Sequence, residues 1–170
     1  MRILILGGNR FFGKKLARDL LHQGHEVTLL NRGNVDDGFG DDVGRIRCDR
    51  EDTDQLRKLV SGKTWDFVYD QVCFDYRSAS AACDIFKGKA RRYIFTSSQS
   101  VYGLGKSQSE SDFDPSSYTP EKFESKSSDY AEAKRQAETA FAKLAPFLSY
   151  TQGFPSSLAT TTSPEDLSFI

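Results

Sequence analysis

The chain has 170 residues, of which 38% are hydrophobic and 28% charged, and its formal net charge at pH 7 is -1. A chain of this length buries one core but not two full domains. The balanced charge argues against nucleic acid as the main partner, because nucleic-acid-binding domains carry an excess of basic residues. No apolar run has the length of a membrane helix or the form of a signal peptide. We therefore expect a cytoplasmic protein without a membrane partner.

Short apolar runs bounded by glycine predict strands, and stretches with apolar residues every three or four positions predict helices. Strands that alternate with helices form βαβ units, with parallel strands and helices on both faces of the sheet. The expected fold is an α/β, three-layer, doubly wound parallel sheet, the Rossmann fold. The expected strands are residues 2–6, 26–30, 45–48, 65–69 and 92–96, and the expected helices are residues 11–23, 52–60, 78–86 and 129–144.

The helix expected at residues 11–23 has an apolar face made of Phe12, Leu16, Leu20 and Leu21. Before the last helix, residues 103–128 are rich in Ser, Pro, Asp, Glu and Lys and have no clear period. We expect a long loop there, and loops of this length are usually functional.

The three cysteines, Cys48, Cys73 and Cys83, show no C-x-x-C spacing. Their odd number and their spacing indicate neither a disulfide framework nor a zinc site. We expect free, mostly buried thiols and no bound metal.

The turn between the first strand and the first helix reads Gly7-Gly8-Asn9-Arg10-Phe11-Phe12-Gly13. Backbone N–H groups and the helix dipole at such a turn can receive a pyrophosphate. Gly7 permits the tight turn, and Gly13 permits close packing of the helix on the strand. Turns before helices also carry glycine for steric reasons alone, but the position of this turn in a βαβ unit favours a dinucleotide site.

The second strand ends at Asn31 and Arg32, without the carboxylate that binds the two ribose hydroxyls of NAD. Arg10 lies in the glycine turn, where a guanidinium can reach a 2'-phosphate. These residues favour NADP over NAD. The alternative is that both arginines are solvated surface charges.

Two further segments contain hydroxyl and ammonium groups suited to proton transfer. The fifth strand leads into Thr96-Ser97-Ser98-Gln99-Ser100-Val101-Tyr102-Gly103, and the last helix begins Tyr130-Ala131-Glu132-Ala133-Lys134. The i, i+4 spacing of Tyr130 and Lys134 places phenol and ammonium on one helical face. A lysine cation beside a tyrosine favours the phenolate, so the phenol can exchange a proton near neutral pH.

Together these motifs resemble the NAD(P)-dependent epimerase/dehydratase family of extended short-chain dehydrogenases/reductases, over residues 1–146. The resemblance implies hydride transfer with NADP on a nucleotide sugar or related substrate, catalysed by Ser98, Tyr130 and Lys134. Ser98 would hold the substrate oxygen, Tyr130 would exchange its proton, and Lys134 would bind the nicotinamide ribose. Asp49 stands in a short acidic turn like the one beside adenine in this family. The residues expected to bind the cofactor are Gly7, Gly8, Asn9, Arg10, Phe11, Phe12, Gly13, Asn31, Arg32, Asp49, Arg50, Tyr130 and Lys134.

The sequence departs from the family in two places. Arg10 stands where the middle glycine of the G-x-x-G-x-x-G turn is expected. Residues 148–170 are rich in Ser and Thr, where the family has a sixth strand and then a substrate lobe. We expect a dinucleotide-binding domain at residues 1–147 and an atypical tail at residues 148–170, left by truncation or a frame shift. The alternative is a natural short protein whose tail packs on the sheet. Surfaces left exposed without the lobe would favour a homodimer.

The form of the glycine turn, with residues 24–33, looks closer to an atypical branch that includes the chloroplast stem-loop RNA-binding proteins. That branch often loses the catalytic tyrosine, whereas Tyr130 and Lys134 are both present here. Two alternatives to an active oxidoreductase or epimerase therefore stay open. One is a non-catalytic dinucleotide-binding regulator, and the other is an RNA-binding protein.

Overall fold

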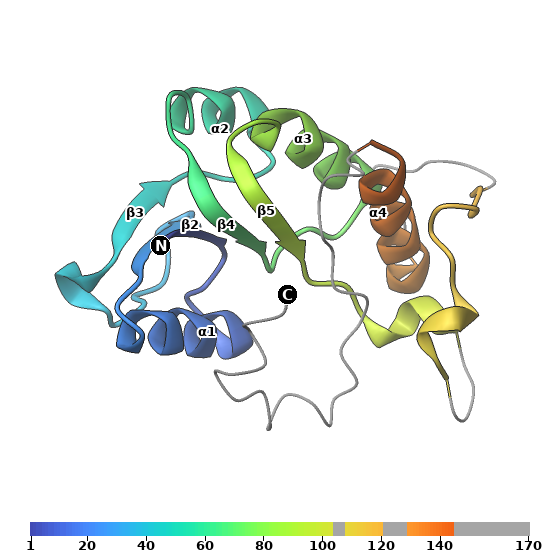
Figure 1. Ribbon diagram of the computed structural model, residues 1–170, viewed down its shortest axis with the longest axis horizontal. Helices are drawn as coiled ribbons and strands as arrows, with labels where there is room; N and C mark the ends of the chain where they lie inside the picture. Colours follow the sequence, from blue (N-terminus) through green and yellow to red (C-terminus); the bar gives the residue numbers. More distant parts are fainter. Residues whose placement is uncertain (104–107, 121–128, 145–170) are drawn as a thin grey trace.

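The computed structural model describes residues 1–103, 108–120 and 129–144. Within them a parallel sheet lies between helices on its two faces (Figure 1). The strands are β1 (Arg2–Leu6), β2 (Glu26–Asn31), β3 (Gly44–Arg47), β4 (Trp65–Asp70) and β5 (Ala90–Phe95). The helices are α1 (Phe11–His22), α2 (Thr53–Leu59), α3 (Tyr76–Phe86) and α4 (Tyr130–Leu144), with short 3-10 turns η1 (Gly40–Asp42), η2 (Gln99–Tyr102) and η3 (Glu110–Asp112).

The strand order is β3-β2-β1-β4-β5, and all pairings are parallel. The chain moves outward from β1 to β3 and then returns to the other side of β1 with β4. In such sheets, ligands bind beyond the carboxyl ends of the strands at the point where the order reverses. Here that point lies between Leu6 and Asp70, which are partners in register. The doubly wound α/β fold predicted from the sequence is confirmed.

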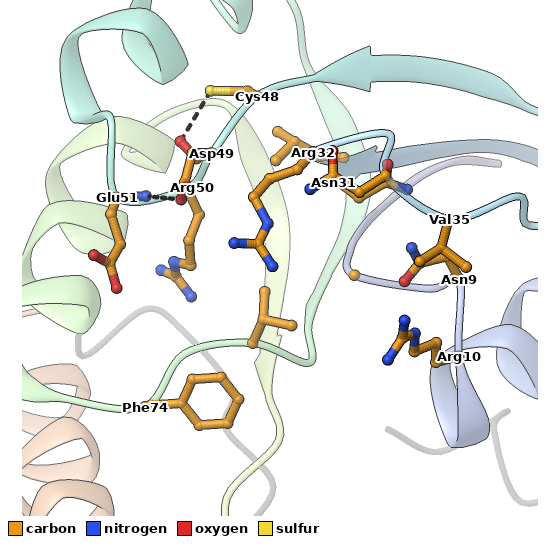
Figure 2. Close-up of a pocket in the computed structure, with 14 residues that line it drawn as sticks. Asn9, Arg10, Asn31, Arg32, Val35, Cys48, Asp49, Arg50, Glu51 and Phe74 are labelled. Atoms are coloured by element: carbon orange, nitrogen blue, oxygen red, sulfur yellow. Dashed lines mark hydrogen bonds between the residues drawn. The ribbon is translucent and has the colours of Figure 1, made fainter.

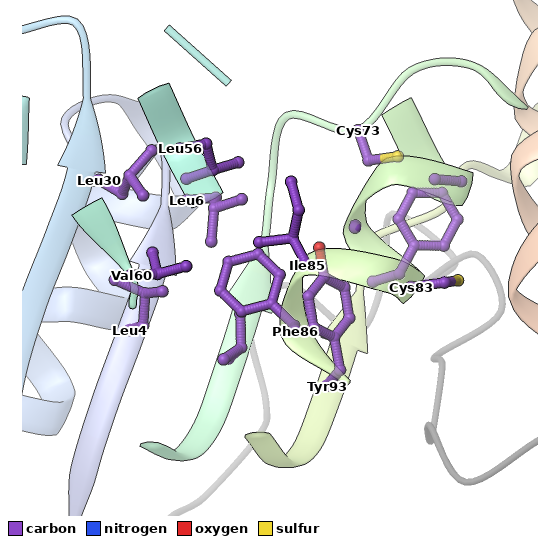
Figure 3. Packing of buried hydrophobic residues seen from close by; sticks show 14 of the residues in the cluster. Leu4, Leu6, Leu30, Leu56, Val60, Cys73, Cys83, Ile85, Phe86 and Tyr93 are labelled. Atoms are coloured by element: carbon purple, nitrogen blue, oxygen red, sulfur yellow. The ribbon is translucent and has the colours of Figure 1, made fainter. Parts of the chain in front are cut away.

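Alternating side chains of β1 supply two separate hydrophobic cores. Ile3 and Ile5 pack toward α1, in a cluster with Ala17 and Leu20. Leu4 and Leu6 point to the opposite face, in the larger cluster beneath α2, α3 and α4 (Figure 3). The sheet is therefore the middle of three layers.

Aromatic stacking fixes α4 against β5. The ring of Phe141 lies 5.5 Å from that of Tyr93 and 4.9 Å from that of Phe95, measured between centroids. The small side chains of Ala137 and Ala140 are fully buried on the same helix. The middle of α4 therefore lies close to the sheet, and so do the polar residues at its neighbouring positions.

Helix α1 differs from its sequence prediction in one respect. Leu20 is buried, and Leu16 and Leu21 pack at the edge of the core, but Phe12 is 46% exposed. The buried line of α1 runs instead through Gly13, Ala17 and Leu20. Small residues bring the helix close to the sheet, so the bulky Phe12 is displaced from the interface.

The three cysteines are free and buried, as predicted. In the described ranges, no helix is both long and apolar enough to cross a bilayer. The predictions for residues 148–170, and for part of the loop at 103–128, fall outside the described residues.

Candidate functional site

The glycine turn after β1 has a backbone that other residues cannot easily adopt. Gly7 and Gly8 have φ values of +96° and +84°, in the left-handed region that favours glycine. A Cβ on Gly13 would lie 3.0 Å from both the Cα and the N of Gly8. Because those atoms belong to the backbone, they cannot move aside. The roles predicted for Gly7 and Gly13 thus have a direct steric basis.

Helix α1 begins at this turn without a side-chain cap. Its N-cap residue, Arg10, makes no capping hydrogen bond, and its first turn has no acidic residue. By contrast, α2 is capped by Asp52 and α3 by Asp75, each accepting a bond from a backbone N–H. The positive end of the α1 dipole therefore remains available for an anion.

A cavity of about 530 Å³ opens beside the uncapped turn, between the ends of β1, β2 and β4 (Figure 2). Its volume is in the range of small-molecule sites. The cavity is lined by Gly7, Asn9, Arg10, Leu30, Asn31, Arg32, Asn34, Val35, Cys48, Asp49, Arg50, Glu51, Val72 and Phe74.

Two exposed arginines reach into this cavity from different elements. Arg10 comes from the start of α1 and Arg32 from the end of β2 (Figure 2). Asn31 Oδ1 accepts a bond from Gly33 N at 2.8 Å and so holds the turn that carries Arg32. Two positive groups that line one cavity form a site suited to a phosphate.

Asp49 also lines the cavity and is exposed. Its Oδ1 accepts a bond from Glu51 N at 3.0 Å, which closes a short turn after β3. Because Asp49 lines the cavity, its carboxylate can accept a bond from an amino group there.

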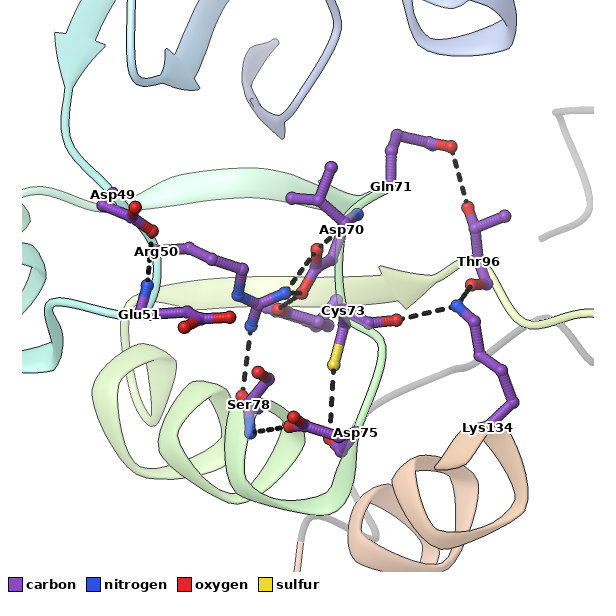
Figure 4. Close-up of polar contacts among 12 residues, drawn as sticks. Asp49, Arg50, Glu51, Asp70, Gln71, Cys73, Asp75, Ser78, Thr96 and Lys134 are labelled. Atoms are coloured by element: carbon purple, nitrogen blue, oxygen red, sulfur yellow. Dashed lines mark hydrogen bonds and ion pairs between the residues drawn. The ribbon is translucent and has the colours of Figure 1, made fainter. Parts of the chain in front are cut away.

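The charge of Arg50 is directed into the protein rather than into the cavity (Figure 4). Its Nη1 lies 2.9 and 2.7 Å from the two carboxylate oxygens of Asp70, and its Nη2 donates to the Ser78 carbonyl at 3.1 Å. Tyr93 donates to the same Asp70 at 2.6 Å. Burial, followed by the charge of Asp70, raises the pKa of Tyr93 well above its usual value, so Tyr93 remains a hydrogen-bond donor.

The ammonium of Lys134 is buried at the ends of two strands. Its Nζ donates to the Cys73 carbonyl at 2.7 Å and to the Thr96 carbonyl at 2.9 Å (Figure 4). The rings of Phe95, Phe74 and Tyr130 lie around it, with centroids at 4.7, 4.9 and 5.9 Å from Nζ. Burial lowers the pKa of Lys134 from its ordinary value.

Tyr130 and Ser98 belong to two different segments near this lysine, the start of α4 and the segment that follows Thr96. Tyr130 is the first residue of α4, and its side chain is half exposed near Lys134. Ser98 caps η2, and its Oγ accepts bonds from the N–H and the hydroxyl of Ser100. No hydrogen bond joins Ser98 to Tyr130 in the described part of the chain. The Lys134 ammonium thus lies beside the Tyr130 ring. It is connected to Ser98 only indirectly, through its hydrogen bond to the Thr96 carbonyl two residues earlier in the chain.

Phe11 and Phe12 begin α1, but they do not line the cavity. Phe11 has a φ of +43° and is 91% exposed. The cavity wall at the turn is formed instead by Gly7, Asn9 and Arg10.

Three residues that shape the site were not among those predicted from the sequence. Asp70 holds Arg50, Phe74 lies between the cavity and Lys134, and Glu138 bonds Ser97. For two of these residues, the sequence contained a feature that could have identified them. Asp70 ends the strand at the switch point, and Glu138 continues the four-residue spacing of Tyr130 and Lys134.

The sheet order, the glycine turn and the cavity at the switch point define an NAD(P)-binding Rossmann domain. The chain belongs to the NAD dependent epimerase/dehydratase family, which it matches over residues 3–147.

Two curated relatives have different activities. The chain is 35% identical over 116 residues to the chloroplast stem-loop binding protein of 41 kDa b from Arabidopsis thaliana, a match that covers 59% of this chain and 30% of that protein. It is 37% identical over 62 residues to a 2-alkyl-3-oxoalkanoate reductase from Stenotrophomonas maltophilia, covering 36% of this chain and 19% of the reductase. The chain thus matches less than a third of either relative.

Solved structures share the fold at low identity. A UDP-glucose 4-epimerase superposes with a TM-score of 0.69 and 18% identity, over 88% of this chain and 50% of the epimerase. A short-chain dehydrogenase/reductase from Veillonella parvula in complex with NADP gives a TM-score of 0.61 and 18% identity, over 88% of this chain and 66% of that one.

Proposed function

We propose that this domain binds NADP in preference to NAD, and that Arg10 and Arg32 hold the 2'-phosphate. Both arginines line the same cavity, and no carboxylate stands at the end of β2 to bind the ribose hydroxyls. Charge-assisted bonds to a phosphate contribute roughly 1.5–3 kcal/mol. This contribution sets the expected preference at about tenfold to a hundredfold.

The other residues around the cavity also suit a dinucleotide. The glycine turn leaves no room for a Cβ at Gly13, and the uncapped start of α1 can receive the pyrophosphate. Asp49, which lines the cavity, would accept a bond from the adenine amino group. Arg50 supports this turn through Asp70, and we propose no contact between its charge and the cofactor.

We further propose that Ser98, Tyr130 and Lys134 catalyse proton transfer to or from a substrate oxygen. A bound nicotinamide would supply or accept the hydride. Tyr130 exchanges the proton, Ser98 hydrogen-bonds the substrate oxygen, and the Lys134 ammonium favours the phenolate of Tyr130. The observation that carries this proposal is the buried Lys134 ammonium, 5.9 Å from the Tyr130 ring and bonded to the strand end that leads to Ser98.

Fluorescence titration with NADPH and NADH at fixed salt tests the cofactor, and hydride transfer with UDP-sugars and with small ketones tests the reaction. NADPH is expected to bind more tightly than NADH. Tyr130→Phe should retain NADPH binding and lose turnover. Equal affinity for the two cofactors contradicts the NADP preference, and turnover by Tyr130→Phe contradicts the catalytic role. Tight NADPH binding without turnover favours a non-catalytic dinucleotide-binding regulator.

The Arabidopsis relative, named for stem-loop binding, favours one second candidate, an RNA-binding protein. A gel-shift titration with a stem-loop RNA, with and without NADPH, tests it. Saturable binding to the stem-loop but not to a single strand of the same composition would support this candidate. Equal, salt-sensitive binding to both RNAs would contradict it.

A further inference from the structure

Helix α4 contains a fully buried carboxyl group that the proposed reaction does not use. Glu138 has no exposed surface, and its Oε1 accepts a hydrogen bond from the Ser97 hydroxyl. Its Oε2 is buried and has no hydrogen-bond partner among the described residues. A buried carboxyl with an unsatisfied oxygen is costly, so its presence calls for a physical reason.

The helix holds the serine segment at three successive points. Lys134 donates to the Thr96 carbonyl at 2.9 Å, Glu138 accepts from Ser97, and Arg135 Nε donates to the Val101 carbonyl at 2.7 Å. Ser98 lies between the second and third of these contacts. The Glu138 contact is the one that acts on the residue next to Ser98.

We propose that Glu138 is a positioning residue whose bond to Ser97 sets the place of the Ser98 hydroxyl, and that this bond changes with the protonation of the carboxyl. The inference rests on the proposed catalytic role of Ser98. Glu138 itself contacts neither the cavity nor Tyr130 in the described structure.

The charged surroundings of Glu138 support a change of state near neutral pH. Burial raises the pKa of Glu138 to about 7, against the opposing effects of the Ser97 bond and the Lys134 charge. Among the described residues, Lys134 on the same helix is the charged group that acts on it. At the β4 end, Asp70, Arg50 and Cys73 interact in turn with Lys134.

The two protonation states hold Ser97 differently. An ionised carboxylate accepts a stronger, charge-assisted bond from the serine hydroxyl than a neutral carboxyl does. The neutral form instead carries a proton that can be donated. The serine segment is therefore expected to be held more firmly above about pH 7 than below it.

Amide spectra of the ¹⁵N-labelled full chain, recorded from about pH 5.5 to 8.5, test the proposal. The Ser97, Ser98 and Ser100 amide signals should shift with a common midpoint near pH 7 in the wild type. Glu138→Gln keeps the volume and an acceptor for Ser97 but cannot ionise, so this transition should be lost. Glu132→Gln, on the same helix but partly exposed, should retain it. Amides that do not titrate, or a transition that persists in Glu138→Gln, would overturn the inference.

A second variant tests the bond if Glu138→Gln fails to fold. Ser97→Ala removes the hydroxyl donor and should reduce the shift of the Ser98 and Ser100 amides at least about twofold. An undiminished shift in Ser97→Ala would also overturn the inference. The measurement needs neither cofactor nor substrate. Failure to bind NADPH therefore contradicts the proposed function, whereas absence of the transition contradicts this inference alone.

Discussion

Arg50 and Asp70 form an ion pair with both partners buried, because the Arg50 side chain is 9% exposed and that of Asp70 is not exposed at all. The pair joins the turn after β3, which lines the cavity, to the end of β4. Asp70 also accepts bonds from Tyr93 and from Val72 N. The turn that presents Asp49 therefore depends on a carboxylate in another element.

We predict that Asp70→Asn lowers the free energy of unfolding by about 3–5 kcal/mol, because it leaves a buried guanidinium without its counter-charge. The matched control is Asp84→Asn, which removes the exposed partner of Arg57 and should cost less than about 1 kcal/mol. Urea denaturation measures both. Equal losses for the two variants would show that the buried pair contributes no more than a surface pair.

Arg32→Ala should weaken NADPH binding by about tenfold to a hundredfold and leave NADH binding unchanged within about twofold. The physical reason is that only NADPH has the 2'-phosphate that the guanidinium would hold. Arg18→Ala removes an exposed arginine of α1 that does not line the cavity, and it should change neither affinity. Fluorescence titration at fixed salt measures both affinities. An equal loss of affinity for NADPH and NADH would contradict the specific contact and assign Arg32 a general electrostatic role.

Gly13→Ala should lower the free energy of unfolding by about 1–3 kcal/mol and abolish NADPH binding, because its Cβ would push the Gly8 backbone out of place. Gly62→Ala provides the comparison. Gly62 also has a positive φ, +69°, but a Cβ there meets nothing within 4 Å. That variant should lose about 1 kcal/mol and retain NADPH binding. If Gly13→Ala binds NADPH normally, the turn does not cradle the cofactor.

The pH dependence of stability should depend on Glu138. Its folded pKa is raised to about 7 from an ordinary value of 4.5. A raised pKa means that the folded state binds the proton more tightly, so the stabilisation is fully present below the unfolded value and is lost as the pH rises through about 7. Relative to Glu138→Gln, the wild type should lose about 2 kcal/mol between about pH 5 and pH 8. Urea denaturation at both pH values measures the difference, and a constant difference would contradict the prediction.

Local sequence patterns predicted the fold and the glycine turn after β1 well, because both features depend on residues that are close together in the chain. The run from Ile3 to Leu6 alternates between two faces in any strand, and Gly7 and Gly13 act on atoms a few residues away. Other contacts depend on chain folding. Arg50 finds its partner 20 residues later, and Ser97 finds Glu138 41 residues later. No local pattern shows where such a charge or hydroxyl will point.

Lys134 also acts as a mechanical link. Its ammonium bonds carbonyls just beyond the ends of β4 and β5, while its backbone belongs to α4. A tilt of α4 would therefore break one of these bonds or move both strand ends with the helix. Motions that open the cavity to a ligand are expected instead on the side of the cavity that is lined by the exposed residues Arg10 and Arg32. Amide hydrogen exchange should be slowest around the three segments that meet at Lys134.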